Sequence, residues 1–301
     1  MTDNTETKSD IQKFWGAVYR NAYGDLDADL DSETLRRLLD ELEDMFRLRD
    51  HLAVVEMPLD ALEGLRVLEI GPGAGGHSAL FAARGAQMTS IDVTRDRAAA
   101  TQRKFDLLQG GAGSGAAAQG DAERLPFADD TFDIVYSNGV LHHTHDTQCA
   151  IDEVLRVMRP GGRAVIMLYS RGSVNYWFNL WFCVGILKGG IIRSRNWLGH
   201  ASEWIGSARQ TETNPITRCY TARELASMFS EFNTLSLRKS EFNLGDTPKI
   251  GRLWRRWRIG RYGTHPGGLL VYGSPWEITT PLERRLGKRV GWAWNILATK
   301  K

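Results

Sequence analysis

The sequence predicts an α/β protein built on a mostly parallel sheet with helices on both faces, and two stretches carry that prediction. The first is an apolar run, Val67–Ile70, which breaks into a turn with Gly71, Gly73 and Gly75 before a helix begins. Glycine lacks Cβ, so this turn can adopt positive φ and let a ligand approach its backbone. The second is an apolar strand that ends in Asp92, 21 residues (92 − 71) after the first glycine. That spacing is typical of the strand, turn, helix and second strand of a nucleotide-binding unit.

Two carboxylates near the glycine turn indicate what kind of ligand it holds. Asp92 occupies the position from which a carboxylate accepts hydrogen bonds from ribose hydroxyls, although a turn residue that closes a strand remains the alternative. Glu69 lies two residues before Gly71. Its negative charge would repel a pyrophosphate and suits the ammonium of an amino-acid moiety, held directly or through water.

The stretch from Val67 to Ser78 resembles the first motif of the class I S-adenosylmethionine (SAM) methyltransferases. It is most similar to the small-molecule group that includes the ubiquinone and menaquinone methyltransferases. Further matching motifs follow in the family's order, at Gly120–Phe127, Asp130–Val135 and 159–168. The resemblance covers about residues 65–170 and implies SAM as the cofactor. It also implies a Rossmann-like, seven-stranded sheet whose last strand is antiparallel to the others.

The resemblance also implies which residues contact SAM. Glu69, Gly71, Gly73 and Gly75 would surround its methionine part, Asp92 with Val93 beside it would hold the ribose, Asp121 and Ala122 would flank the adenine, and Asn138, next to Ser137, would lie near the methionyl end. Asp121 has a second interpretation, as a residue that caps a turn.

Length and composition indicate one enlarged domain with additions. The chain has 301 residues, of which 42% are hydrophobic, enough for a large core. The expected divisions are an N-terminal helical lid (1–60), a SAM-binding core (61–170), an apolar substrate-cap insertion (171–220), and a C-terminal part (221–301) that completes the sheet and carries a basic insertion at 243–285.

The three cysteines and the N-terminus indicate a cytoplasmic protein, with peripheral membrane contact as an option. Cys149, Cys183 and Cys219 have no paired or metal-type spacing, which indicates free thiols and no zinc site. Residues 1–10 are polar and lack the basic and apolar regions of a signal peptide.

Two helices are predicted before the core. Residues 31–56 begin with a capping-box-like sequence and place apolar residues at helical spacing, which predicts one amphipathic helix. A shorter apolar stripe runs from Ile11 to Tyr19. In the family it would belong to a lid over the cofactor, and ordinary packing on the sheet is the alternative.

The segment 176–187 is apolar on every side if it is helical. Asn179 interrupts it and Lys188 follows it, so it is too short to span a bilayer. Three interpretations remain: a core helix, the wall of a lipophilic substrate pocket, or an element lying in a membrane interface.

Charge is polarised along the chain, although the net charge is only +2. Residues 191–301 contain 19 Lys or Arg and 8 Asp or Glu, whereas residues 1–60 contain 7 and 15. The stretch 252–261 holds five arginines and two tryptophans. It is interpreted as a solvated face, a contact with anionic lipid or an anionic substrate, or a partner for the acidic N-terminal helix of the same or another subunit, which would allow a homo-oligomer. Nucleic acid is disfavoured because no nucleic-acid-binding signature accompanies the patch.

The remaining sequence completes the sheet. Thr221 is expected to cap a helix that ends near Phe232, 235–238 to form the sixth strand, and Trp292–Thr299 the last one. Residues 243–285 are longer than a hairpin and are expected to cap the substrate site.

Histidines after the fourth strand are the candidates for catalysis. Methyl transfer from a sulfonium is an in-line displacement that depends mainly on positioning, but a hydroxyl acceptor needs a base. His142 and His143 are the candidate bases, with His142 preferred because strand alternation would turn the two apart. A turn histidine that bonds to backbone is the alternative, and a metal site formed with His145 is disfavoured because adjacent imidazoles point apart. His145 departs from the family's pattern.

The preferred function is therefore a SAM-dependent methyltransferase acting on a small, lipophilic or anionic acceptor, with O-methylation favoured over C-methylation. A non-catalytic SAM-binding protein that docks on a membrane or partner is the first alternative. An oxidoreductase that uses NAD is the second, and Glu69 and the motif at 120–127 argue against it.

Overall fold

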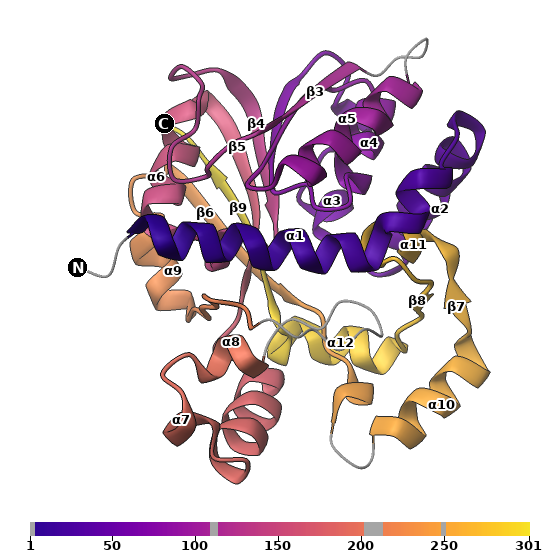
Figure 1. Cartoon of the computed structure of the whole chain (residues 1–301), viewed down its shortest axis with the longest axis vertical. Coiled ribbons are helices and arrows are strands. Elements are labelled where there is room, and N and C mark those ends of the chain that lie inside the picture. Colours follow the sequence, from indigo (N-terminus) through magenta and orange to yellow (C-terminus); the bar gives the residue numbers. More distant parts are fainter. Residues whose placement is uncertain (1–3, 109–113, 202–212, 248–250) are drawn as a thin grey trace.

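A seven-stranded sheet forms the centre of the molecule (Figure 1) in the computed structural model, which describes residues 4–108, 114–201, 213–247 and 251–301. The strand order is β3-β2-β1-β4-β5-β9-β6. The strands are β1 (Arg66–Ile70), β2 (Gln87–Asp92), β3 (Ser114–Gln119), β4 (Phe132–Asn138), β5 (Met158–Tyr169), β6 (Thr234–Ser240) and β9 (Ala293–Thr299). Only β9 is antiparallel to its neighbours, β5 and β6. The predicted Rossmann-like sheet and its antiparallel last strand are confirmed.

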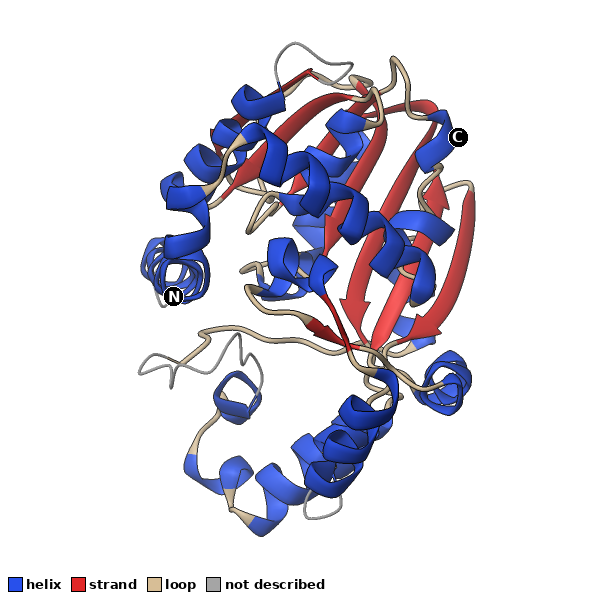
Figure 2. Ribbon diagram, turned by 90° about the vertical axis from the view of Figure 1, so that its right-hand side faces the viewer, coloured by secondary structure: helices blue, strands red, loops and turns tan. Residues whose placement is uncertain are grey.

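Helices cover both faces of this sheet (Figure 2), as the alternation of side chains along β1 requires. Val67 belongs to the core on one face, which includes residues of α2 (Ser32–Leu48), α4 (Gly76–Ala83) and α5 (Arg95–Leu108). Leu68 and Ile70 belong to the core on the other face, with α6 (Thr147–Val157) and α9 (Ala222–Met228). Glu69 alternates with these two residues, so its side chain lies on the same face as Val67.

The predicted helix 31–56 is interrupted. α2 ends at Leu48, Asp50 has φ +50°, and a short α3 (Leu52–Val55) follows, with the His51 imidazole accepting a hydrogen bond from Ala53 N–H. The N–H of His51 donates to the carbonyl of Phe46 and that of Asp50 to the carbonyl of Arg47, which is a Schellman ending. Glycine usually takes the left-handed position in this motif. Because aspartate takes it here, the sequence lacks the usual stop signal.

Two additions lie beyond the edge where the parallel strands end, in the lower half of Figures 1 and 2. After β5 come the π-helix η3 (Asn175–Leu187), α7 (Gly190–Arg193) and α8 (Trp197–Ala201). After β6 come η4 (Leu244–Asp246), α10 (Gly251–Tyr262), β7 (Thr264–His265), η5 (Pro266–Gly268), α11 (Leu269–Tyr272), β8 (Trp276–Glu277) and α12 (Pro281–Val290). The short strands β7 and β8 pair with each other, outside the main sheet.

The apolar segment 176–187 is not a core helix. Within η3 only Leu180 and Gly185 are buried. Its other apolar side chains lie at or near the surface, so one of the three interpretations is removed. In the described ranges, no helix combines the length and the apolar character that a bilayer crossing requires.

The basic stretch 252–261 forms α10, and its arginines have two different environments. Arg258 is buried and donates to Glu283 at 2.9 Å and to Glu277 at 2.6 Å. Glu283 is fully buried and also completes the capping box of α12 with Thr280. This ion pair joins α10 to α12. Arg252 and Arg256 stay exposed, as the solvated-face interpretation expects.

The ends of three predicted elements shift slightly. Thr221 caps α9 in a capping box as expected, but α9 ends at Met228, before Phe232. β6 is longer at both ends than 235–238, and β9 begins one residue after Trp292.

Candidate cofactor site

A cavity of about 470 Å³ lies at the edge where the parallel strands end. Its wall combines the glycine turn after β1, the ends of β2 and β3, the loop after β4, and α1 (Asn4–Asp29), which crosses this edge in Figure 1. Seven predicted site residues line it: Gly71, Gly73, Asp92, Val93, Asp121, Ala122 and His143. Four others lie outside its wall: Glu69, Gly75, Asn138 and His142.

The glycine turn leaves no room for side chains. Gly71, Gly73 and Gly75 have φ of +71°, +55° and +78°. A Cβ on Gly71 would approach Val140 to 2.5 Å, and one on Gly73 would approach the Tyr19 hydroxyl to 2.5 Å. Positive φ and close contact together therefore require glycine. Gly75 instead packs against α5 and serves the helix packing rather than the cavity, since its Cβ would lie 2.8 Å from Thr101 Oγ1.

Asp92 is held at the end of β2 by the residues that follow it. Its Oδ1 accepts hydrogen bonds from Thr94 N–H and Thr94 Oγ1, both at 2.8 Å. Burial raises the pKa of Asp92, and the hydrogen bonds from Thr94 and from Gly73 N–H oppose that shift. The Gly73 contact also ties the glycine turn to β2. The carboxylate is thus fixed in the cavity wall.

The first helix closes the cavity near Asp121. Lys8 Nζ lies 2.6 Å from Asp121 Oδ2 and 2.9 Å from Glu123 Oε2. Burial alone would lower the pKa of Lys8, but its hydrogen bonds to the two carboxylates raise it overall. Asp121 Oδ1 also accepts from Glu123 N–H, so Asp121 does cap a turn while facing the cavity. Farther along α1, Gln12 Nε2 donates to the carbonyl of Val93 at 3.0 Å.

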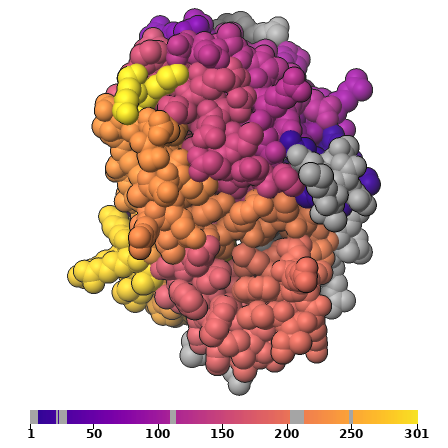
Figure 3. Space-filling view, turned by 90° about the vertical axis from the view of Figure 1, so that its left-hand side faces the viewer, coloured from indigo at the N-terminus to yellow at the C-terminus, as the bar shows by residue number. Residues whose placement is uncertain are grey.

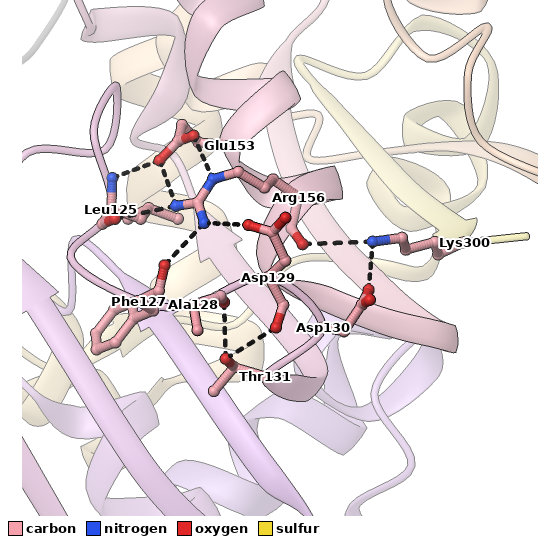
Figure 4. Close-up of polar contacts among 9 residues, drawn as sticks. All are labelled: Leu125, Phe127, Ala128, Asp129, Asp130, Thr131, Glu153, Arg156 and Lys300. Carbon is pink, nitrogen blue, oxygen red and sulfur yellow. Dashed lines mark hydrogen bonds and ion pairs between the residues drawn. The ribbon is translucent and has the colours of Figure 1, made fainter.

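Arg156 fixes the loop that follows Asp121 (Figure 4). Its guanidinium donates to the carbonyls of Leu125 and Phe127 at 3.0 and 2.8 Å and pairs with Asp129 and Glu153 at 2.8 and 2.7 Å. Glu153 in turn accepts from Leu125 N–H. Two side chains of α6, Arg156 and Glu153, therefore hold the connection between β3 and β4 in place.

Glu69 does not line the cavity, so its placement does not support a direct contact with an ammonium group, and contact through water stays a prediction. Its side chain is 1% exposed and bonds to the Ser78 hydroxyl, which also lies 2.7 Å from Ser90 Oγ. Burial raises the pKa of Glu69 to about 8, so it is mainly uncharged at neutral pH and attracts no cation by charge. Through Ser78 and Ser90 it joins β1, α4 and β2 on both sides of the glycine turn.

The two candidate bases differ in their access to the cavity, which His143 lines and His142 does not. His142 is fully buried against Tyr169, with ring centroids 3.8 Å apart, and burial lowers its pKa well below the usual range. His143 lines the cavity, under the ring of Trp15 at 5.0 Å. The preference for His142 assumed strand alternation, but residues 141–143 form a 3-10 turn, in which that alternation does not hold.

Sequence analysis missed the polar contribution of α1. The apolar stripe Ile11–Tyr19 indicated a helix on the core, but nothing in the sequence showed that Lys8 and Gln12 would reach residues about 81 to 113 positions away. Such contacts depend on how the helix crosses the sheet edge, and no local pattern encodes that angle.

A second cavity, of about 620 Å³, lies beside the two additions. Segments far apart in the chain line it: 49–51, 174–179, 238–247 and parts of 255–292. Aromatic rings connect the two cavities, because Trp292 in the second wall packs on Tyr169 at 4.4 Å and Tyr169 lies 5.6 Å from His143.

Residues 68–166 match the protein family described as a methyltransferase domain. A demethylmenaquinone methyltransferase of Mycolicibacterium paratuberculosis is 39% identical over 109 residues, which are 35% of this chain and 46% of that protein. An uncharacterised protein of Escherichia coli, YafE, is 55% identical over 49 residues, 16% of this chain and 24% of its own. The chain spans about half the length of the demethylmenaquinone methyltransferases that it matches.

A solved structure shares the fold. It is a chain from the complex between the Haloferax volcanii Trm112 methyltransferase activator and a methyltransferase, 15% identical, with a TM-score of 0.51. The similarity covers 87% of this chain and 94% of that one. At this identity the likeness concerns the fold alone.

Proposed function

Because residues 68–166 belong to the class I SAM-dependent methyltransferase family, we propose that this chain transfers the methyl group of SAM to a small, amphiphilic, quinone-related acceptor. The observation that carries the proposal is the cavity that brings the glycine turn, Asp92 and Asp121 together at one edge of the sheet. Relatives described as demethylmenaquinone methyltransferases support the acceptor class.

In this proposal the cofactor lies along the predicted wall residues other than His143. The backbone of Gly71 and Gly73 faces the methionine part, Asp92 accepts from the ribose hydroxyls with Val93 beside it, and Asp121 and Ala122 flank the adenine. An adenine amino group would compete with Lys8 for Asp121, so binding is expected to couple to the position of α1. Glu69 and Gly75 support the turn from behind, and Asn138, at the end of β4, stays outside the wall.

We propose that the acceptor binds against the aromatic rings that connect the two cavities, Tyr169 and Trp292. Tyr169 and Trp292 supply flat apolar faces, and Lys239 of the second wall supplies a positive charge. Burial lowers the pKa of Lys239, whose Nζ donates to the Gly172 carbonyl and lies 4.7 Å from the Trp294 ring. Such a site suits a ring with an oxygen substituent and an apolar chain.

SAM supplies a methyl group on a positively charged sulfur, and the protein supplies alignment and a base. His143 Nδ1 lies 2.8 Å from the carbonyl of Ile216, which can only accept, and 3.1 Å from Asn214 Nδ2, which can only donate. We take the shorter contact as the hydrogen bond, which assigns the proton to Nδ1. The other nitrogen, Nε2, then holds the lone pair that can take a proton from a hydroxyl acceptor. We therefore propose His143 as the base for O-methylation and His142 as a packing residue.

The proposal is tested by calorimetric titration with SAM and S-adenosylhomocysteine, followed by transfer of a labelled methyl group to a reduced naphthoquinone with a short isoprenoid chain. We expect both nucleosides to bind and Asp92→Ala to weaken them at least tenfold, because it removes the fixed acceptor. Absence of SAM binding would overturn the proposal. Binding without transfer to this acceptor or to lipid and phenolic extracts would favour the non-catalytic alternative.

The role of His143 is tested by His143→Gln, with His142→Phe as the matched ring substitution next to it. We expect kcat for His143→Gln to fall by about 10²–10⁴, the usual contribution of a general base, with SAM affinity unchanged. His142→Phe should keep most of kcat. Equal kcat values in wild type and His143→Gln would exclude this base and favour an acceptor that loses no proton to it.

A further inference from the structure

The segment 177–192 concentrates exposed apolar side chains. The described chain has thirteen exposed large hydrophobic residues, and seven of them lie in these sixteen positions. They include Trp177, Phe182, Leu187 and Ile192, which are 52%, 41%, 66% and 92% exposed. Large apolar patches of this kind usually mark a contact surface, since water solvates them poorly.

The stretch 172–202, which contains this segment, carries positive charge without negative charge. Residues 172–202 contain Lys188, Arg193 and Arg195 and no aspartate or glutamate. All three cations are exposed. A surface that combines tryptophan, aliphatic side chains and unopposed cations has the composition of an interfacial membrane element.

This surface forms one end of the molecule. Figure 3 shows residues of the segment gathered, in salmon, at the end opposite the core of the sheet. α10 lies at the same end in Figure 1 and adds exposed Leu253 and Trp257 together with exposed Arg252 and Arg256. Arg258 of the same helix is buried in the ion pair with Glu283 and contributes nothing to the surface.

We propose that this end, formed by η3, α7 and the exposed face of α10, docks on the surface of an anionic lipid bilayer. Charge complementarity favours lipid over a second copy of the chain, because self-pairing of η3 and α7 would bring like charges together with no acidic partner in 172–202. The apolar side chains enter the headgroup region while the cations contact lipid phosphates.

Docking would place the second cavity next to the bilayer. Asn175 and Asn179 of η3 line that cavity, while Trp177 and Phe182 of the same helix are exposed. An amphiphile could then pass from the lipid to the acceptor site along η3. This last step rests on the proposed function, whereas the docking itself does not.

The test is co-sedimentation of the whole chain with vesicles of phosphatidylcholine alone or with 30% phosphatidylglycerol, at about 50 and 500 mM salt. We expect binding to the anionic vesicles that weakens at high salt. Leu187→Asp with Ile192→Asp, and separately Arg193→Glu with Arg195→Glu, should each lower the partition coefficient at least tenfold. Matched controls on other helices, Val55→Asp on α3 and Arg36→Glu with Arg37→Glu on α2, should bind as wild type.

Three results would overturn the inference: no vesicle binding at low salt, equal binding by wild type and both surface variants, or a dimer in sedimentation velocity that Ile192→Asp dissociates. The readout is independent of chemistry, since SAM titration of each variant should match wild type. A chain that binds vesicles but not SAM would refute the proposed function and leave the docking surface intact.

Discussion

The two cavities of this molecule are lined by different kinds of chemical group. The first is walled by glycine backbone and by carboxylates at strand ends, most of them within 71–145. The second is walled by charged side chains that largely neutralise one another, such as Arg49 with Glu241 and Arg258 with Glu277, contributed by segments from 49 to 292. A wall of backbone is encoded locally, whereas a wall of ion pairs is encoded by the meeting of distant segments.

The comparison predicts different consequences of mutation in the two walls. Loss of one partner in the second wall leaves a buried charge without compensation, so its main effect is on stability. Loss of a glycine in the first wall leaves the fold in place and fills the space needed by a ligand, so its main effect is on binding.

The largest effect is expected for Arg258→Met. It leaves Glu283, which is fully buried, without its guanidinium partner, and such losses usually cost about 3–5 kcal/mol of unfolding free energy. Urea unfolding measures this, with Arg256→Met as the control because Arg256 is exposed on the same helix and should change stability by less than about 0.5 kcal/mol. Similar unfolding midpoints for the two variants would mean that the ion pair does not hold α10 to α12.

A smaller effect is expected for Gly73→Ala, measured as SAM affinity. The new Cβ would lie 2.5 Å from the Tyr19 hydroxyl, so the tyrosine must move and the Cβ occupies space at the cavity wall. We therefore expect SAM binding to weaken at least about 100-fold, which is about 2.7 kcal/mol of binding free energy. Gly64→Ala is the matched control, because Gly64 has a similar φ of +75° but no neighbour within 4 Å of the new Cβ. If both variants bind SAM equally weakly, backbone strain rather than lost space would be the cause.

The smallest effect concerns the support behind the first wall. Glu69 has a pKa of about 8 in the fold against about 4.5 unfolded, so unfolding releases a proton between these values and stability falls as pH rises. The pKa of buried His77 is lowered to about 3, which gives the opposite slope up to about pH 6.5. Between pH 6.5 and 8 the titration of Glu69 therefore lowers the free energy of unfolding, and His77 no longer opposes this change.

Glu69→Gln should remove a decline of about 2 kcal/mol over that interval, measured as unfolding free energy at a series of pH values. Exposed Glu63→Gln is the control and should keep the wild-type slope. A variant curve parallel to the wild-type curve from pH 6.5 to 8 would show that Glu69 is ionised in the folded protein.

Local patterns predicted the residues whose roles depend on their immediate neighbours. Gly71 and Asp92 were identified because a turn and a strand end impose their requirements within a few positions. The preference for His142 assumed extended geometry, whereas residues 141–143 form a 3-10 turn and His143, not His142, lines the cavity. Sequence analysis singled out Glu69, but the direction of its side chain depends on which face of β1 meets α4. That face packs in the same core as Phe46 and Phe81, which lie outside β1.

By itself, the sequence determined the α/β class, the glycine turn and the order of the strands along the chain, and it carried the resemblance to the SAM methyltransferases, because each follows from periodicity or from residues close together in the chain. Only the tertiary structure decided that Arg258 is buried, that η3 is exposed and that Lys8 meets Asp121. An arginine has the same local pattern whether it faces water or a distant glutamate. Its environment is fixed by which segments pack together, and that is a property of the whole fold.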